Sequence, residues 1–279
     1  MDKAYWWHNT AIIKPELSKF HYPFKPEFGD APSYCFSFVK DWVGDRVLEL
    51  GCGTGWLRES WHIKDYTGVE RSSFCEPFES RLRAEARRNS VVNVSVEEFI
   101  DNTSDSFDTI ICYESFHEFP ETALDVIRSD LLESAGHAII VDARSWWPSG
   151  LRLTDIQGLQ LQFEHWIPDH FFDYMRIAEV SLDTFAALEE KGVPREEILE
   201  CAESNMQPQL YYRLVAGMSV ESVRSALPSL DLTPTDLDYV ILVMRKLTRG
   251  NRHVVRESCR ITPLSVAHLM KCGMTEDAP

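Results

Sequence analysis

The sequence of 279 residues has few basic residues for the number of acidic ones. It holds 28 Lys and Arg against 44 Asp and Glu, which gives a formal net charge of −16 at pH 7. Nucleic acids and anionic membrane surfaces attract basic proteins, so this balance excludes both as default partners. Hydrophobic residues make up 44% and charged residues 26%, which is typical of a globular chain and not of a disordered one.

The sequence also lacks paired cysteines and long apolar runs. Its seven cysteines are dispersed, with no CxxC pair and no metal-ligand spacing, so we expect reduced thiols, no metal site and a cytoplasmic protein. The first residues contain no apolar stretch of the kind that directs export. An apolar run such as 239–244 is far shorter than the roughly 20 residues that span a bilayer, so we expect no membrane segment.

Short runs of β character alternate with helical stretches through the first half of the chain. The expected strands are 46–50, 66–69, 91–96, 107–112, 137–141 and, near the end, 239–246. The expected helices are 32–43, 73–88, 120–133 and 220–227. This alternation predicts βαβ units and a doubly wound, parallel sheet.

A glycine-rich segment, 51–55, follows the first expected strand. Its sequence GCGTG combines residues that adopt unusual backbone angles with the start of a helix, where N–H groups attract carboxylates or phosphates. The spacing is GxGxG. It is not the GxGxxG of dinucleotide-binding folds, because the third glycine would fall at Trp56, and the GK[ST] of a P-loop is absent.

Around this segment the chain resembles the class I S-adenosylmethionine-dependent methyltransferases. Their first motif, a hydrophobic strand with an acidic residue and GxGxG, matches 47–55. Their acidic residue at the end of the next strand, which binds the ribose hydroxyls, matches Glu70. The stretch 94–98 matches the adenine-contacting site after the third strand, and 108–120 matches a strand followed by a segment with His and Pro. The resemblance covers roughly 32–145 and the final strand.

The resemblance implies the fold, the cofactor and the residues that bind it. The fold is an α/β, Rossmann-like doubly wound sheet of about seven strands, mostly parallel with an antiparallel last strand. The cofactor is S-adenosyl-L-methionine, which leaves as S-adenosyl-L-homocysteine. The cofactor-binding residues implied are Glu49, Gly51, Cys52, Gly53, Gly55, Glu70, Arg71, Ser95, Val96, Glu97, Cys112 and Tyr113.

The candidate catalytic residues follow the fourth expected strand, at the edge of the sheet where ligands of such folds bind. His117 titrates near neutrality and suits a general base; its other reading is a structural residue that caps a helix or orients the loop. Glu114 and Glu118 flank it, and either could be the base, bind a cationic substrate group or raise the pKa of His117.

The rest of the chain divides around this cofactor domain, which we place at 32–145 and 217–247. We expect an aromatic N-terminal arm or lid at 1–31, a helical cap for the acceptor at 146–216 and an extension at 248–279. Three roles of the arm stay open. It packs on its own domain, it covers a ligand, or it exchanges between subunits, and the last of these would make a homo-oligomer. The aromatic residues expected to bind substrate, unless they only form the core of the cap, are Tyr5, Trp6, Tyr22, Trp146, Trp147, Trp166, Phe171 and Tyr174.

These features predict a methyltransferase that acts on a small, largely hydrophobic or aromatic metabolite in specialised, natural-product metabolism. The methyl group moves in line to oxygen, nitrogen or carbon. Three alternatives stay open. They are carbon methylation of an indole or isoprenoid with coupled cyclisation, methylation of a peptide at nitrogen or oxygen, and a relative that binds S-adenosylmethionine without methylating.

Overall fold

The computed structural model describes residues 6, 10, 23–71, 90–119, 135–143, 159–203, 205–232 and 239–246. The chain forms two units, Met1–Lys246 and Leu247–Pro279, and the second lies outside the described residues. The helices expected at 73–88 and 120–133 also lie outside them. So do four residues expected to bind substrate, Tyr5, Tyr22, Trp146 and Trp147.

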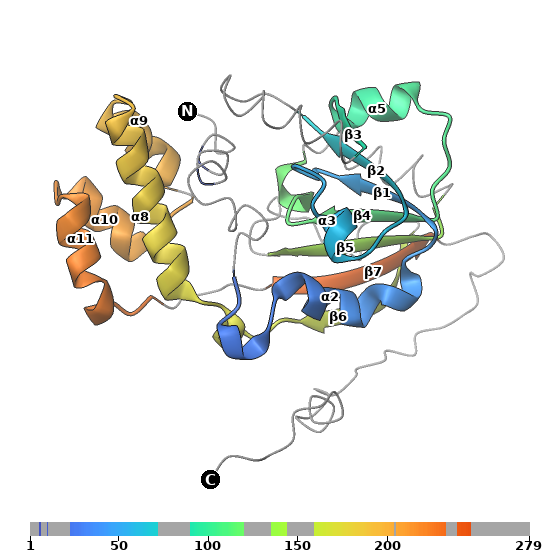
Figure 1. Ribbon diagram of the computed structural model, residues 1–279, viewed down its shortest axis with the longest axis horizontal. Helices are drawn as coiled ribbons and strands as arrows, with labels where there is room; N and C mark the ends of the chain where they lie inside the picture. Colours follow the sequence, from blue (N-terminus) through green and yellow to red (C-terminus); the bar gives the residue numbers. More distant parts are fainter. Residues whose placement is uncertain are drawn as a thin grey trace, which may run out of the picture. The chain divides into compact units, whose positions relative to one another are not determined.

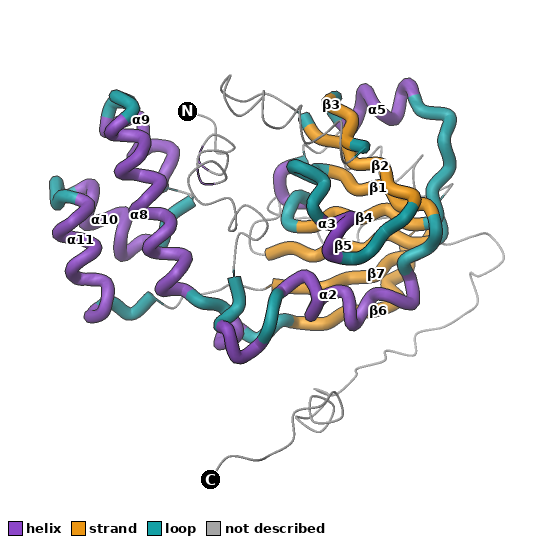
Figure 2. The backbone as a smooth tube through the Cα atoms, viewed as in Figure 1, coloured by secondary structure: helices purple, strands orange, loops and turns teal. Residues whose placement is uncertain are grey.

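The first unit contains a seven-stranded sheet with the order β3-β2-β1-β4-β5-β7-β6 (Figures 1 and 2). The strands are β1 (Arg46–Leu50), β2 (Asp65–Glu70), β3 (Val91–Asn93), β4 (Thr109–Tyr113), β5 (His137–Ala143), β6 (Leu159–Trp166) and β7 (Tyr239–Lys246). The first five pair in parallel, and β7 runs antiparallel to both of its neighbours, β5 and β6. The predicted fold, a mostly parallel sheet with an antiparallel last strand, is confirmed.

Two expectations about these elements are wrong. The helical cap expected over 146–216 contains β6, a full edge strand of the sheet. The third expected strand, 91–96, stops at Asn93, because Ser95 begins a helix instead. The Ser95 side chain accepts a hydrogen bond from the backbone N–H of Glu98 at 3.1 Å, as an N-cap residue does.

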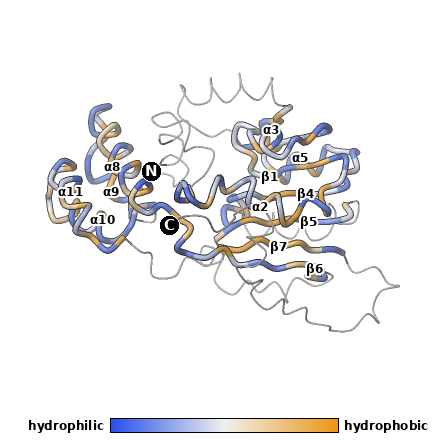
Figure 3. The backbone as a smooth tube through the Cα atoms, turned by 60° about the horizontal axis from the view of Figure 1, so that its bottom comes forward, coloured by the Kyte–Doolittle hydropathy of each residue, from blue (hydrophilic) through white to orange (hydrophobic). Residues whose placement is uncertain are grey.

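The central strands are buried on both faces, as parallel strands covered by helices are. Val47, Ile111 and Ile139 face one cluster of buried residues. Leu48 and Ile110, on the alternate positions of β1 and β4, face the other. Figure 3 shows hydrophobic residues along β7 and a mixture along the edge strand β6.

Short helices precede the first strand and follow several of the others. The elements are η1 (Pro26–Phe28), α2 (Ala31–Val39), η2 (Lys40–Trp42), α3 (Leu57–Ser60), α5 (Val96–Asn102) and η3 (Phe116–Glu118). Asp30 caps α2 by accepting a hydrogen bond from the N–H of Ser33 at 2.9 Å. Together α2 and η2 account for the helix expected at 32–43.

Four helices follow β6 and the turn η7 (Asp169–Phe171). They are α8 (Tyr174–Glu190), α9 (Arg195–Ala202), α10 (Pro208–Val215) and α11 (Val220–Ala226), which the turn η8 (Leu227–Ser229) ends. α8 packs against α9 and α11, and α10 packs against both of these. The helix α11, expected in the cofactor domain, therefore packs with the cap helices. Among the described residues, no helix is both long and apolar enough to cross a membrane.

The described part of the N-terminal arm packs on this helical group. Trp6 is fully buried and belongs to the same cluster as the core of α8. Thr10 bonds the Thr184 hydroxyl on α8 at 2.9 Å. Residues 23–25 run beside the start of α8, where Asp173 donates its N–H to the carbonyl of Pro23 at 2.8 Å.

Candidate active site

The glycine segment turns directly out of β1 in left-handed backbone conformations. Gly51, Gly53 and Gly55 have φ angles of 68°, 55° and 74°, a region that other residues rarely adopt. A Cβ on Gly51 would lie 2.5 Å from the Cβ of Ser115, so the segment packs tightly on the chain that follows β4. A Cβ on Gly53 would meet no atom within 4 Å, which leaves room beside this backbone.

Glu70, at the end of β2, lies beside the glycine segment. Its Oε2 accepts a hydrogen bond from the N–H of Gly53 at 2.8 Å. Burial raises the pKa of Glu70 to about 7, although the N–H groups of Gly53 and Arg71 oppose the shift. The Arg71 side chain itself is exposed. The expected ribose-binding carboxylate and the expected glycine segment therefore form one site.

A buried polar cluster packs beside the glycine segment. Tyr66 donates its hydroxyl proton to Glu49, which is 1% exposed. Burial raises the pKa of Glu49 to about 8. A Cβ on Gly68 would lie 2.5 Å from the sulfur of Cys52 and 2.8 Å from the Tyr66 hydroxyl, so only glycine fits there. Sequence reasoning named Glu49 and Cys52 as site residues but missed Tyr66 and Gly68.

The third group of expected cofactor residues follows β3. Ser95 is the N-cap of α5, Val96 is buried, and Glu97 is half-buried in the first helical turn. Asn93, which the sequence analysis did not single out, pairs in register with Glu70. Its Oδ1 is buried and has no hydrogen-bond partner among the described residues. A buried acceptor of this kind needs a partner, so it suits a bound ligand.

The last two expected cofactor residues, on β4, point to opposite faces. Cys112 is buried in the cluster that contains Leu48 and Ile110. Tyr113 faces the other way, with its ring 5.4 Å from that of Trp56 in an edge-to-face contact beyond the glycine segment. A contact between Cys112 and a cofactor would therefore involve its backbone.

These observations fit S-adenosylmethionine, the cofactor that the resemblance implies. The open backbone at Gly53, the carboxylate of Glu70 and the orphaned Oδ1 of Asn93 lie at neighbouring strand ends. Carboxylate and amide oxygens accept hydrogen bonds from ribose hydroxyls and from an adenine amine. We therefore propose these residues as holders of the nucleoside part of S-adenosylmethionine.

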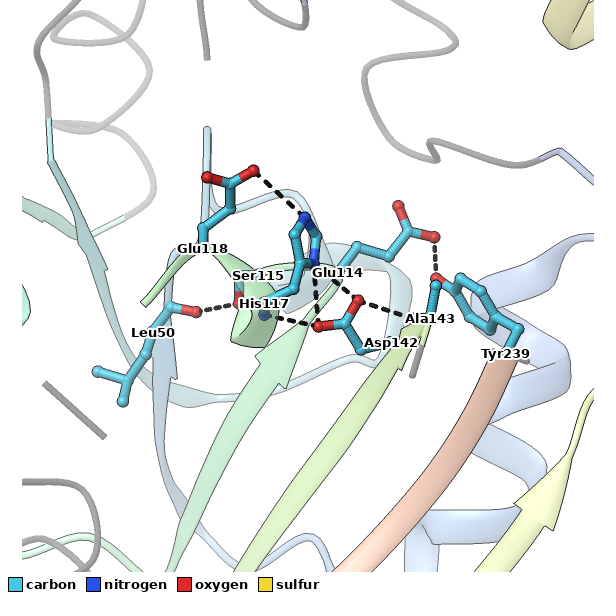
Figure 4. A network of polar contacts seen from close by, with 8 residues as sticks. All are labelled: Leu50, Glu114, Ser115, His117, Glu118, Asp142, Ala143 and Tyr239. Atoms are coloured by element: carbon cyan, nitrogen blue, oxygen red, sulfur yellow. Dashed lines mark hydrogen bonds and ion pairs between the residues drawn. The ribbon is translucent and has the colours of Figure 1, made fainter. Parts of the chain in front are cut away.

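His117 lies in η3 and is held by two carboxylates (Figure 4). Its Nδ1 is 2.8 Å from Oδ1 of Asp142, its backbone N–H donates to Oδ2 of Asp142 at 2.9 Å, and its Nε2 is 3.3 Å from Oε1 of Glu118. Burial alone would lower the pKa of His117, but the hydrogen bonds and charges of the two carboxylates outweigh it and raise the pKa to about 9.

A histidine with this pKa carries its proton at neutral pH and cannot accept another. The direction of this shift suits the other reading of His117, a residue that orients the loop, and its role as a general base stays a prediction. Asp142 is fully buried and also accepts the N–H of Ala143 at 2.8 Å. Sequence reasoning missed Asp142; the available signal was a charged residue at the end of an apolar strand.

Glu114 is the third of the expected catalytic residues, after His117 and Glu118, and its carboxylate is buried at this edge of the sheet. It is 8% exposed and has a φ of 51°, a strained value for a residue with a side chain. Strain of this kind is concentrated at functional sites. Tyr239, at the start of β7, donates its hydroxyl proton to Oε1 of Glu114 across the end of β5 (Figure 4).

A series of aromatic rings continues from Tyr239 toward the cap helices. Phe172 lies 5.4 Å from the Tyr239 ring and 6.0 Å from that of Tyr174, measured between centroids. Phe24 contacts Phe172 at 5.3 Å. Of these four residues, only Tyr174 was among those expected to bind substrate; the contact of Phe172 with Tyr239, which is far away in the chain, exists only in the fold.

The other expected substrate residues have different surroundings. Phe171 is buried and stacks on Phe28 at 4.1 Å. Trp166 ends β6 at the same sheet edge and is 40% exposed. Trp6 is in the helical core described above. Within the described ranges, no group of His, Cys, Asp and Glu could hold a metal ion.

Comparison with known proteins identifies the family. The family model for a methyltransferase domain matches residues 23–183, more than half of the chain. The chain belongs to the methyltransferase-domain family. This confirms the expected class, that of enzymes dependent on S-adenosylmethionine, and with it the cofactor.

Individual relatives of this methyltransferase are distant. A ubiquinone biosynthesis O-methyltransferase from Neisseria meningitidis is 31% identical over 88 residues, which are 30% of this chain and 37% of that protein. The chain thus matches little more than a third of that relative's length. Two solved structures share the fold. The cyclase SpnF has a TM-score of 0.53, 16% identity and coverage of 86% of this chain and 93% of its own. YjhP from E. coli has a TM-score of 0.50 and 15% identity, and the match covers 86% of this chain and 100% of that protein.

Proposed function

We propose that this methyltransferase transfers a methyl group from S-adenosylmethionine to oxygen, nitrogen or carbon of a small, largely hydrophobic or aromatic metabolite of specialised metabolism. One observation carries the proposal. The buried carboxylate of Glu114 lies at the same strand ends as the glycine segment and is joined through Tyr239 to a series of aromatic rings. Such rings favour a flat, apolar acceptor.

The cofactor supplies a methyl group on a positively charged sulfur, and transfer to a protic acceptor leaves one proton to be removed. The chain's own residues would position the acceptor and exclude water, which supplies much of the rate of such a displacement. Glu114 would take or share the proton, with Tyr239 fixing the carboxylate through its hydrogen bond. His117, already protonated, would hold the loop against Asp142.

Calorimetric titration with S-adenosylhomocysteine tests the cofactor part. We expect wild type to bind it and Gly53→Arg to lose measurable binding, since the arginine would fill the open space beside the backbone. Gly192→Arg is the matched control. Gly192 also has a left-handed φ, 79°, and open space around a Cβ, but it lies at the end of α8. No binding to wild type, or equal loss in both variants, would refute this assignment.

Product analysis tests the transfer itself. Protein with labelled S-adenosylmethionine is incubated with phenols, indoles, aliphatic amines and a basic peptide, and labelled products are identified. A methylated phenol, indole or amine is the expected result, and a methylated peptide alone would contradict the small-molecule assignment. The fold also occurs in a protein named as a cyclase. Cofactor binding without transfer to any acceptor would favour the non-methylating alternative.

A further inference from the structure

Tyr174, the first residue of α8, carries a buried hydroxyl. The residue is 8% exposed, and its Oη has no hydrogen-bond partner among the described residues. A buried hydroxyl left unpaired costs stability, so native proteins rarely keep one unless something else bonds it. Phenylalanine would fill the same space without that cost.

The position of this hydroxyl relates it to the acceptor side of the site. The rings of Tyr174 and Tyr239 contact opposite ends of a short series with Phe172 between them, at 6.0 Å and 5.4 Å. The hydroxyl of Tyr239 is committed to Glu114. The series therefore begins with a carboxylate and its tyrosine, continues through an apolar ring and ends at a tyrosine whose hydroxyl has no partner among the described residues.

We propose that Tyr174 determines acceptor specificity by bonding a second polar group of the substrate. This rests on the proposed function, because it uses the same acceptor site. The substrate class is a flat, fused ring system with one polar group on each of two opposite sides. The reacting group faces Glu114, and the second bonds the hydroxyl of Tyr174. A site built to bond a hydroxyl rejects an analogue that lacks it, since its own polar group is then left unpaired.

The test uses two probes that differ by one hydroxyl, 2-naphthol and 2,6-dihydroxynaphthalene. Their affinities are measured by fluorescence titration for the full chain saturated with S-adenosylhomocysteine, in wild type, Tyr174→Phe and Tyr212→Phe. Tyr212 is 69% exposed on α10 and serves as the matched control. Melting temperature and affinity for S-adenosylhomocysteine are measured on the same samples.

We expect wild type and Tyr212→Phe to prefer the diol about tenfold, the discrimination that one hydrogen bond of about 1.4 kcal/mol gives. Tyr174→Phe should bind both probes equally, keep its affinity for 2-naphthol and melt at the same or a higher temperature. Three results would overturn the proposal. Tyr174→Phe could still prefer the diol, wild type could bind neither probe, or Tyr174→Phe could melt several degrees lower than wild type. Any of these results with intact S-adenosylhomocysteine binding leaves the cofactor assignment standing, whereas loss of that binding in wild type refutes the proposed function itself.

Discussion

The proton on His117 should make the stability of the protein depend on pH in a defined window. The imidazole is only 11% exposed, and it is bracketed by Asp142, which is fully buried, and Glu118, which is 47% exposed. Because water screens the Glu118 charge, Asp142 supplies most of the stabilisation of the charged ring. The substitution His117→Gln keeps a side chain of similar reach and removes the titration.

The size and sign of the effect follow from the shift. Raising a pKa from 6.5 to about 9 corresponds to about 3 kcal/mol in favour of the charged form. A group whose folded pKa lies above its unfolded pKa stabilises fully below the unfolded value. That contribution is then lost as pH rises through the folded value. The loss should therefore occur between about pH 6.5 and pH 9 and be complete above it.

Urea unfolding at pH 6 and pH 10 measures this directly. The fall in unfolding free energy between the two pH values should be about 3 kcal/mol larger in wild type than in His117→Gln. His170→Gln, which replaces an exposed histidine, should behave as wild type. An NMR titration gives the pKa itself, with the His117 signal assigned by its absence in the variant. A midpoint at or below 7, or equal pH dependence in both proteins, would refute the reasoning.

Three further predictions concern neighbouring residues. Affinity for S-adenosylhomocysteine should rise as pH increases through about 7, because the Glu70 carboxyl then ionises and accepts hydrogen bonds better; calorimetry should show that Glu70→Gln loses this dependence. Gly68→Ala should destabilise by about 1–3 kcal/mol in urea because its Cβ meets the sulfur of Cys52, and adding Cys52→Ala should recover part of the loss. Tyr239→Phe should cost about 1–3 kcal/mol in the same assay, since Glu114 loses a buried donor; an unchanged midpoint would contradict that bond.

The sequence was informative where a structure depends on adjacent residues. The glycine segment and Glu70 could be predicted because a strand, a tight turn and a strand end are local patterns. The strand β6 was missed, although its sequence LQLQFEHW alternates apolar and polar residues as an edge strand does. The stretch was instead included in the expected helical cap at 146–216, although aromatic residues favour strands.

The contacts that decide the chemistry of the acceptor side could not be predicted in this way. Whether His117 is a base depends on Asp142, 25 residues later, and what Glu114 binds depends on Tyr239, 125 residues later. Neither distance along the chain carries a periodic signal. Parallel strand order brings them together, because β4, β5 and the start of β7 meet at one edge.

Four acidic side chains lie near this edge of the sheet, with a physical consequence. Glu49 and Glu70 are held near the glycine segment with pKa values raised by burial, and Glu114 and Asp142 are buried at the next strand ends. Like charges buried together destabilise each other unless a cation or a shared proton offsets them. The proton on His117 offsets Asp142 on the acceptor side. A sulfonium would do the same on the cofactor side, so we expect the site to favour the charged cofactor over its neutral product, which would help the product to leave.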